Sequence, residues 1–145
     1  MAIVIEGAHP DDFDAVLALV KESGLPEAGL LDHRDGLLIA RLDGQLIGSA
    51  ALELYGEHAL LRSVAVSPGH RGMGVGRCLT DAALVFARAH GVRRVYLLTT
   101  TAPEFFRGLG FESTDRAAVP AAVQSSAEFR FACPATALVM TRAIA

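Results

Sequence analysis

The sequence predicts an α/β fold, in which a mixed β-sheet of the α+β type, with parallel and antiparallel strands, is flanked by helices on both faces. Two observations lead to this prediction. Strand-like apolar segments alternate with helix-like segments in the order β-α-α-β-β-β-α-β-α-β-β. An Asp43-Gly44 dipeptide also stands between two apolar runs, which is a strong hairpin signal and indicates that part of the sheet is antiparallel.

Local signals mark each element of the first half. Pro10 suits the first position of a helix, and Asp11 and Asp12 suit its first turn. Gly24 and Pro26 lie in the segment that ends this helix. The expected strands are 3–7, 37–42, 45–54 and 59–66, and 27–34 is expected to be a short helix or a loop.

In the second half the apolar period changes to that of a helix from Gly76 onward, and Gly91 closes this helix. Pro103 opens a further helix, which Gly110 stops. The remaining expected elements are a strand at 95–98, a helix at 104–109, a strand that begins at 111, a short helix plus loop at 119–129 and a strand at 137–141.

The composition is that of a globular chain. Of its 145 residues 52% are apolar and 20% are charged, and we expect a single domain over residues 1–145. The net charge of -3 gives no basic field for nucleic acid, and the apolar runs are too short for a membrane span. No signal peptide is evident, and Cys78 and Cys133 show neither zinc spacing nor a disulfide framework. We therefore expect a cytoplasmic protein without a metal ion.

The most informative segment is 64–77, which reads as a strand, a glycine-rich turn and the start of a helix. Glycine lacks a Cβ, so its backbone can turn tightly and approach a ligand closely. The first turn of a helix has unpaired N–H groups and a partial positive charge. Together these features predict a cradle for an anion, best suited to phosphate.

Three kinds of phosphate loop are conceivable. A P-loop requires Lys followed by Ser or Thr after the last glycine, whereas Arg77-Cys78 stands here. A dinucleotide fingerprint requires Gly-x-Gly-x-x-Gly after the first strand, whereas this segment lies in mid-chain. The third pattern is Arg71-x-x-Gly74-x-Gly76, and a glycine-rich turn that only caps a helix remains the alternative to all three.

That pattern resembles the pyrophosphate loop, Arg/Gln-x-x-Gly-x-Gly/Ala, of the GNAT superfamily of CoA-dependent N-acetyltransferases. A second landmark is the segment 99–111, which ends in Gly110-Phe111 and is similar to the strand–loop–helix that flanks the CoA arm in this family. The order of elements also resembles that of the family, and the resemblance covers nearly the whole chain. It implies the GNAT fold and acetyl-CoA as the co-substrate.

Within the superfamily, the chain is similar to the acetyltransferase domain of N-acetylglutamate synthases and to N-acetyltransferases associated with arsenic operons. The second similarity rests on the segments 60–66 and 96–101 and on Cys133-Pro134. It implies acetylation of the primary amine of a small amino-acid-like substrate, such as a toxic arsenic- or phosphinothricin-type analogue. Where the synthases carry basic residues, 133–137 carries none, which argues against simple glutamate binding.

The resemblance also implies which residues hold acetyl-CoA. The backbone of the 64–66 strand would pair with the pantetheine arm, and one of its N–H groups would hold the thioester oxygen. Arg71 or Arg77 would add a charged contact to the pyrophosphate. The full set of expected CoA-binding residues is Val64, Ala65, Val66, Arg71, Gly72, Met73, Gly74, Val75, Gly76, Arg77, Phe105 and Phe106.

Two residues depart from the family pattern at catalytic positions. Leu60 stands where a glutamate often accepts the proton of the attacking amine, and Phe106 stands where a tyrosine often protonates the leaving thiolate. We expect Glu53, on the neighbouring strand, to replace the base; Glu57 and His58 are weaker candidates. Tyr55 or Tyr96 could replace the acid, although a thiolate is a good enough leaving group without one. Ser63 is the second expected catalytic residue.

Arg62 is the expected substrate anchor, because it is a charged residue in an apolar strand and arginine can hold a carboxylate or phosphinate with two parallel hydrogen bonds. Its alternative role is a buried ion pair, and the alternative for Glu53 is a solvated strand carboxylate. Ser63, Thr100 and Thr101 are expected to add hydroxyl contacts to the substrate. A non-catalytic acyl-CoA sensor remains the alternative function, and the family resemblance makes a homodimer a reasonable expectation.

Overall fold

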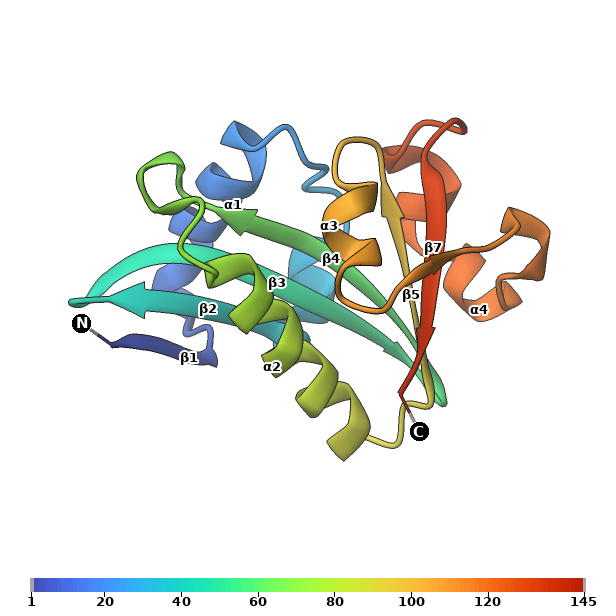
Figure 1. Cartoon of the computed structure of the whole chain (residues 1–145), viewed down its shortest axis with the longest axis horizontal. Helices are drawn as coiled ribbons and strands as arrows, with labels where there is room; N and C mark the ends of the chain where they lie inside the picture. The colour runs from blue at the N-terminus through green and yellow to red at the C-terminus, as the bar shows by residue number, and fades with distance from the viewer. Residues whose placement is uncertain (1, 145) are drawn as a thin grey trace.

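The computed structural model describes residues 2–144 and has one seven-stranded sheet with the order β1-β2-β3-β4-β5-β7-β6 (Figure 1). The strands are β1 (Ile3–Gly7), β2 (Leu37–Leu42), β3 (Gln45–Tyr55), β4 (His58–Val66), β5 (Arg94–Thr99), β6 (Glu112–Ser113) and β7 (Leu138–Ala143). The pair β4–β5 is parallel and the other pairs are antiparallel, so the sheet is mixed and the predicted fold class is confirmed.

The helices lie on both faces of this sheet. They are α1 (Phe13–Glu22), α2 (Val75–Ala89), α3 (Pro103–Arg107) and α4 (Ala121–Gln124), with 3₁₀ turns η1 (Pro10–Asp12), η2 (Leu30–Gly36), η3 (Pro68–His70) and η4 (Arg116–Ala118) and a π-helical turn η5 (Glu128–Ala132). Buried side chains of α2 and α3 pack with Leu52 and Leu61 on one face. On the other face α1 packs on β2, and α4 packs on Leu60 and Tyr96.

The strands β4 and β5 separate along their length, as the green and yellow strands of Figure 1 show. They pair only from His58–Arg94 to Leu60–Tyr96, so the β5-facing edge of β4 has no strand partner beyond Leu60. The register between β3 and β4 also shifts near Ser63, whose φ of 57° is left-handed. A bulge of this kind bends a strand and re-aims its side chains. The separation of β4 from β5 opens the sheet in the middle of the fold, and the bulge in β4 lies at the same place.

Several predicted boundaries are corrected by one or more residues. The helix α2 begins at Val75 rather than at Gly76, because Gly74 adopts a left-handed conformation immediately before it. The strand expected from 111 onward is only the two-residue β6. The segment 119–129 holds α4, and η5 begins at its end, because Pro120 stands at the start of α4 and Ser125 ends it.

One ion-pair group fixes the start of α1 against the sheet and makes the stability of the fold depend on pH. The Arg41 guanidinium lies 2.7 Å from Asp12 and 3.0 Å from Glu6. Its hydrogen bonds to Asp12 lower the pKa of that carboxyl below the usual 3.8. A lowered folded-state pKa stabilises the protein above the unfolded-state pKa, and this stabilisation is lost as pH falls through the folded-state value.

We therefore expect Asp12→Asn to lower the free energy of unfolding at neutral pH and to reduce its decline between about pH 4 and pH 2. Urea unfolding at a series of pH values measures this dependence. Asp11→Asn is the matched control, since Asp11 is its exposed neighbour. If both variants kept the wild-type pH dependence, the stabilising role of the Arg41–Asp12 pair would be wrong.

Candidate active site

The glycine-rich loop has the geometry of an anion cradle. Gly72 and Gly74 have φ values of 82° and 81°, and a Cβ at either position would meet no other part of the protein within 4 Å. The backbone there faces open space, and the first turn of α2 follows directly at Val75. The side chain of Arg71 is bound back to the loop, because its Nε donates to the Val66 carbonyl at 3.0 Å.

A pocket of about 580 Å³ lies in front of this loop. Of the twelve residues expected to bind CoA, only Met73 is absent from its lining, and the Met73 side chain is 48% exposed. Phe105 of α3 contributes to the lining, and its ring would lie 3.2 Å from a Cβ on Gly76. The glycine at 76 therefore lets the loop and α3 approach closely, and the pocket between them suits an extended ligand with a phosphate at one end.

A second pocket, of about 180 Å³, lies deeper in the gap between β4 and β5. The expected substrate residues Arg62, Ser63, Thr100 and Thr101 all line it, from these two strands and the turn after β5. The two pockets share five lining residues: Leu25, Val64, Thr101, Ala102 and Phe106. They therefore adjoin, so a group at the end of a ligand in the first pocket can meet a molecule in the second.

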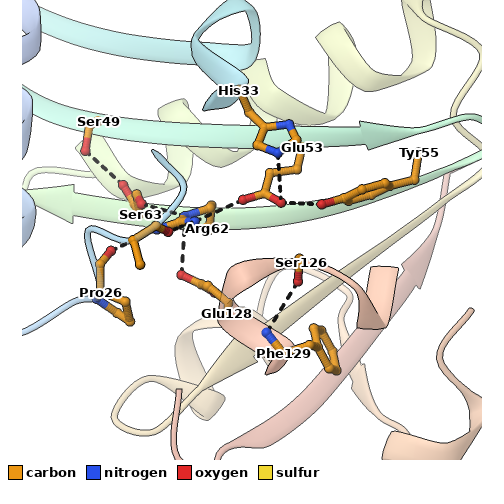
Figure 2. Close-up of polar contacts among 11 residues, drawn as sticks. Pro26, His33, Ser49, Glu53, Tyr55, Arg62, Ser63, Ser126, Glu128 and Phe129 are labelled. Carbon is orange, nitrogen blue, oxygen red and sulfur yellow. Dashed lines mark hydrogen bonds and ion pairs between the residues drawn. The ribbon is translucent and has the colours of Figure 1, made fainter. Parts of the chain in front are cut away.

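The Arg62 side chain is fully buried in a polar cluster, shown in Figure 2. Its Nη1 donates to Glu53 Oε2 at 2.9 Å and to the Ala28 carbonyl at 2.6 Å. Its Nη2 donates to the Pro26 carbonyl at 2.9 Å, and its Nε donates to Ser63 Oγ at 3.2 Å. Arg62 thereby ties β4 to the segment that follows α1.

These bonds limit what Arg62 can offer to a substrate. A guanidinium has five N–H groups, and the hydrogen bonds above use four of them. A grip on a carboxylate by two parallel hydrogen bonds is therefore not open while these bonds persist. The buried ion pair, which was the alternative role for Arg62, is present, and one N–H on Nη2 is not used by these four hydrogen bonds.

Glu53 lies behind Arg62 and does not belong to the lining of either pocket. Its carboxylate is 1% exposed, binds Arg62, accepts a hydrogen bond from the Tyr55 hydroxyl and lies 3.4 Å from His33 Nε2 (Figure 2). Glu53 is thus not a solvated strand carboxylate. Its role as the base stays a prediction, because the structure gives it partners but no contact with the pockets.

The other candidates for proton transfer also lie outside both pockets. Burial and its hydrogen bond with Glu53 raise the pKa of Tyr55, so its hydroxyl remains protonated. Tyr96 packs with Leu60 in the core beneath α4. Glu57 and His58 are at the closed end of β4, where the strands still pair. Phe106 lines both pockets, and its apolar ring has no proton to donate to a leaving thiolate.

Glu128 is a residue that the sequence analysis missed. It is 3% exposed, lines the deeper pocket and lies with its Oε2 3.4 Å from Arg62 Nε. Burial raises the pKa of Glu128 to about 7; Arg62 acts in the opposite direction, Glu53 adds to the rise, and hydrogen bonding with Cys133 lowers it. The only local signal for Glu128 is that it is a charged residue between Ala127 and Phe129 in a largely apolar segment.

Cys133 lies beside Glu128 in the same lining. Burial and the adjacent Glu128 carboxylate raise the pKa of the Cys133 thiol to about 12, so it stays protonated. Within residues 2–144, no three side chains of the metal-ligating types are grouped so that they could hold a metal ion. No helix in the same range is both long enough and apolar enough to cross a bilayer.

Comparisons with known proteins agree with this geometry. A family model described as the acetyltransferase (GNAT) family matches residues 6–111. An uncharacterized N-acetyltransferase from Chlorobaculum tepidum is 29% identical over 116 residues, which are 77% of this chain and 74% of that protein. An amino-acid acetyltransferase from Neisseria meningitidis is 30% identical over 129 residues, which are 81% of this chain but 29% of that protein.

Solved structures share the fold. An N-acetylglutamate synthase from Neisseria gonorrhoeae, complexed with coenzyme A and N-acetyl-glutamate, has a TM-score of 0.86 at 24% identity and covers 100% of this chain. A Mycobacterium tuberculosis protein in complex with CoA and NLQ has a TM-score of 0.81 at 25% identity, with 97% of this chain and 98% of that chain covered. The present chain spans only 36% of the synthase.

Proposed function

The chain belongs to the acetyltransferase (GNAT) family, and on this premise we propose that it transfers the acetyl group of acetyl-CoA to the primary amine of a small, amino-acid-like molecule. The observation that carries the proposal is the junction of two pockets where β4 and β5 separate. One pocket is lined by the glycine-rich loop, which is proposed to hold a pyrophosphate, and the other is small and has hydroxyl groups, Arg62 and Glu128 in its lining.

In this proposal acetyl-CoA lies along the free edge of β4, with its pyrophosphate on the amides of the glycine-rich loop and of the first turn of α2. Its thioester then reaches the shared wall of the two pockets, near Val64. An N–H of the 64–66 segment then stabilises the oxyanion that forms when the amine attacks. The protein's main contribution is to hold amine and thioester at the same junction.

The acceptor is small in this account. The deeper pocket, at about 180 Å³, is below the roughly 300–1,000 Å³ of pockets for drug-sized ligands. The hydroxyls of Ser63, Thr100 and Thr101 and the remaining N–H of Arg62 are the groups proposed to contact an amino-acid-like substrate. An amino-acid acetyltransferase among the relatives supports this substrate class.

We further propose an arsenic- or phosphinothricin-type amino-acid analogue as the acceptor to be tested first. The three segments that resemble the arsenic-operon enzymes are 60–66, 96–101 and Cys133-Pro134. Residues from all three line the deeper pocket, which supports a shared substrate class. A homodimer is also expected from the family resemblance, and size-exclusion chromatography with light scattering would check it.

The experiment is release of CoA, followed with a thiol reagent, from the protein with acetyl-CoA and a panel of amines. The panel holds glycine, L-glutamate, phosphinothricin, an amino-acid arsenical and a polyamine, each with an amine-free control. We expect turnover with one or more of the amino-acid-like members and none with the polyamine. Turnover with the polyamine alone would contradict the substrate class. Silence on every amine, with acetyl-CoA still bound in calorimetry, would contradict transfer itself.

A further inference from the structure

We propose that the Glu128 carboxylate accepts the proton that the acceptor's ammonium group must lose before it can attack acetyl-CoA. This inference rests on the proposed acetyl transfer and assigns a catalytic group to it. An amine in water near neutral pH is mostly protonated, and a protonated nitrogen has no lone pair to attack with. The acceptor pocket therefore needs a proton acceptor, or it must wait for the rare neutral amine.

Glu128 lies in the wall of the acceptor pocket. Glu128 belongs to η5, which lies on the opposite face of the sheet from α2, and its side chain lines the acceptor pocket. The wall that this pocket shares with the CoA pocket includes Val64 and Ala102. Its side chain is 4% exposed, and one of its oxygens faces Arg62 Nε at 3.4 Å (Figure 2). A buried carboxylate in the wall of this pocket is where an incoming ammonium group would find a negative charge.

Few side chains in the lining of this pocket can exchange a proton. Among the residues of its lining, only Arg62, Glu128 and Cys133 can gain or lose a proton. The guanidinium of Arg62 has N–H donors and no acceptor atom, so it cannot act as a base. The Cys133 thiol, with its pKa raised to about 12, keeps its own proton. Glu128 is the one group in this lining that can act as a base.

The electrostatic surroundings give Glu128 a suitable strength. Burial raises its pKa to about 7, where a general base near neutral pH is most effective. The charged and titratable groups that face it are Arg62 on β4, Glu53 on β3 and Cys133 after η5; Arg62 and Cys133 lower the pKa, and Glu53 raises it. An exposed glutamate, with a pKa near 4.5, would hold the amine's proton much less readily.

The ammonium R–NH₃⁺ gives one proton to Glu128, which becomes a neutral carboxylic acid, and the nitrogen lone pair then forms a C–N bond to the thioester carbon. When the tetrahedral intermediate collapses, the C–S bond breaks and its electron pair leaves with the sulfur of CoA. The second nitrogen proton goes to this thiolate, and Glu128 returns its proton to water. Acetyl-CoA and R–NH₃⁺ thus give the amide, CoA–SH and one H⁺.

The test is the pH dependence of kcat/KM for whichever of glycine, L-glutamate and phosphinothricin the wild type acetylates fastest. The wild type should lose activity below about pH 7, where Glu128 becomes protonated. Glu128→Gln should lower kcat about 100-fold near pH 7. Its acid limb should move up to the pKa of the free amine, because only an amine that is already neutral can then react. Glu128→Asp should retain the limb near pH 7 at a lower rate.

Glu53→Gln is the matched control, since it neutralises the other carboxylate on Arg62 without touching the pocket. It should keep an acid limb in its pH profile below that of the free amine. If Glu128→Gln left the wild-type profile unchanged, Glu128 would not be the base, while acetyl transfer would stand. A limb that moved to the amine's pKa in Glu53→Gln alone would assign the base to Glu53. If the wild type acetylated none of the three amines or the rest of the panel, the transfer itself would be wrong, and this inference with it.

Discussion

Gly74→Glu is expected to weaken the binding of acetyl-CoA about 1,000-fold. The new carboxylate would stand at the left-handed residue before α2, facing the open space where the pyrophosphate is proposed to lie. Two like charges about 4 Å apart repel by about 4 kcal/mol at the effective dielectric constant of a protein surface, which corresponds to a factor of about 1,000. Isothermal calorimetry with acetyl-CoA measures this change.

Gly56→Glu is the matched control for that experiment. Gly56 also has a positive φ, of 68°, and a Cβ there would also meet nothing within 4 Å. It lies in the β3–β4 turn, at the end of β4 opposite the glycine-rich loop. Both variants should lose similar stability from backbone strain, but only Gly74→Glu should lose binding. Equal affinities in the two variants would contradict the position of the pyrophosphate.

Arg62→Met is expected to cost about 3–5 kcal/mol of unfolding free energy, because it leaves the buried Glu53 and Glu128 without their cation. It also removes the bonds to the Pro26 and Ala28 carbonyls. In the variant the Glu128 carboxyl, whose pKa burial raises and Arg62 no longer lowers, should prefer to be protonated in the folded state, so stability should rise as pH falls from about 7 toward the unfolded-state pKa near 4.5. Urea unfolding at two pH values measures both effects.

Arg41→Met provides the comparison, since Arg41 also joins two carboxylates, Glu6 and Asp12, but near the surface. Its loss should be much smaller, because water solvates the carboxylates that remain. A triple variant that combines Arg62→Met with Glu53→Gln and Glu128→Gln should recover part of the loss, since no unpaired buried charge is left. If the triple variant were as unstable as Arg62→Met alone, the loss would come from packing and not from charge.

The sequence carries a local signal for the cofactor pocket but not for the acceptor pocket. The loop around Gly74 could be predicted because its strand, its glycines and its helix are contiguous in the chain. Even there, the sequence alone could not indicate that Arg71 bonds back to the Val66 carbonyl, since this contact depends on the fold of the loop.

The buried ion pair of Glu53 and Arg62 does have a signal in the sequence, which is the register of the β3–β4 hairpin. In the β3–β4 hairpin Glu53 pairs with Leu60 and Ala51 pairs with Arg62, so Glu53 and Arg62 are diagonal neighbours on one face of the sheet. The register of a hairpin with its turn at Gly56 would have predicted this ion pair. It would also have indicated that Arg62 is not free to hold a substrate carboxylate by two bonds.

Glu128 could not be found in this way. It follows Arg62 by 66 positions and approaches it only because η5 packs over the gap between β4 and β5. Its environment, a pocket wall with one arginine and one thiol, is assembled from β4, η5 and the residues after η5. No periodicity in the 119–129 segment encodes that arrangement.

The most direct test of the account uses acetyl-CoA that carries an isotopic label in its acetyl group. After incubation with the protein and the amine panel, mass spectrometry would locate the label. We predict that the label appears as an amide on an amino-acid-like acceptor, in amounts equal to the CoA released. Label found only as free acetate, or left on CoA with every amine, would contradict the proposal that the two adjoining pockets bring an amine to the thioester.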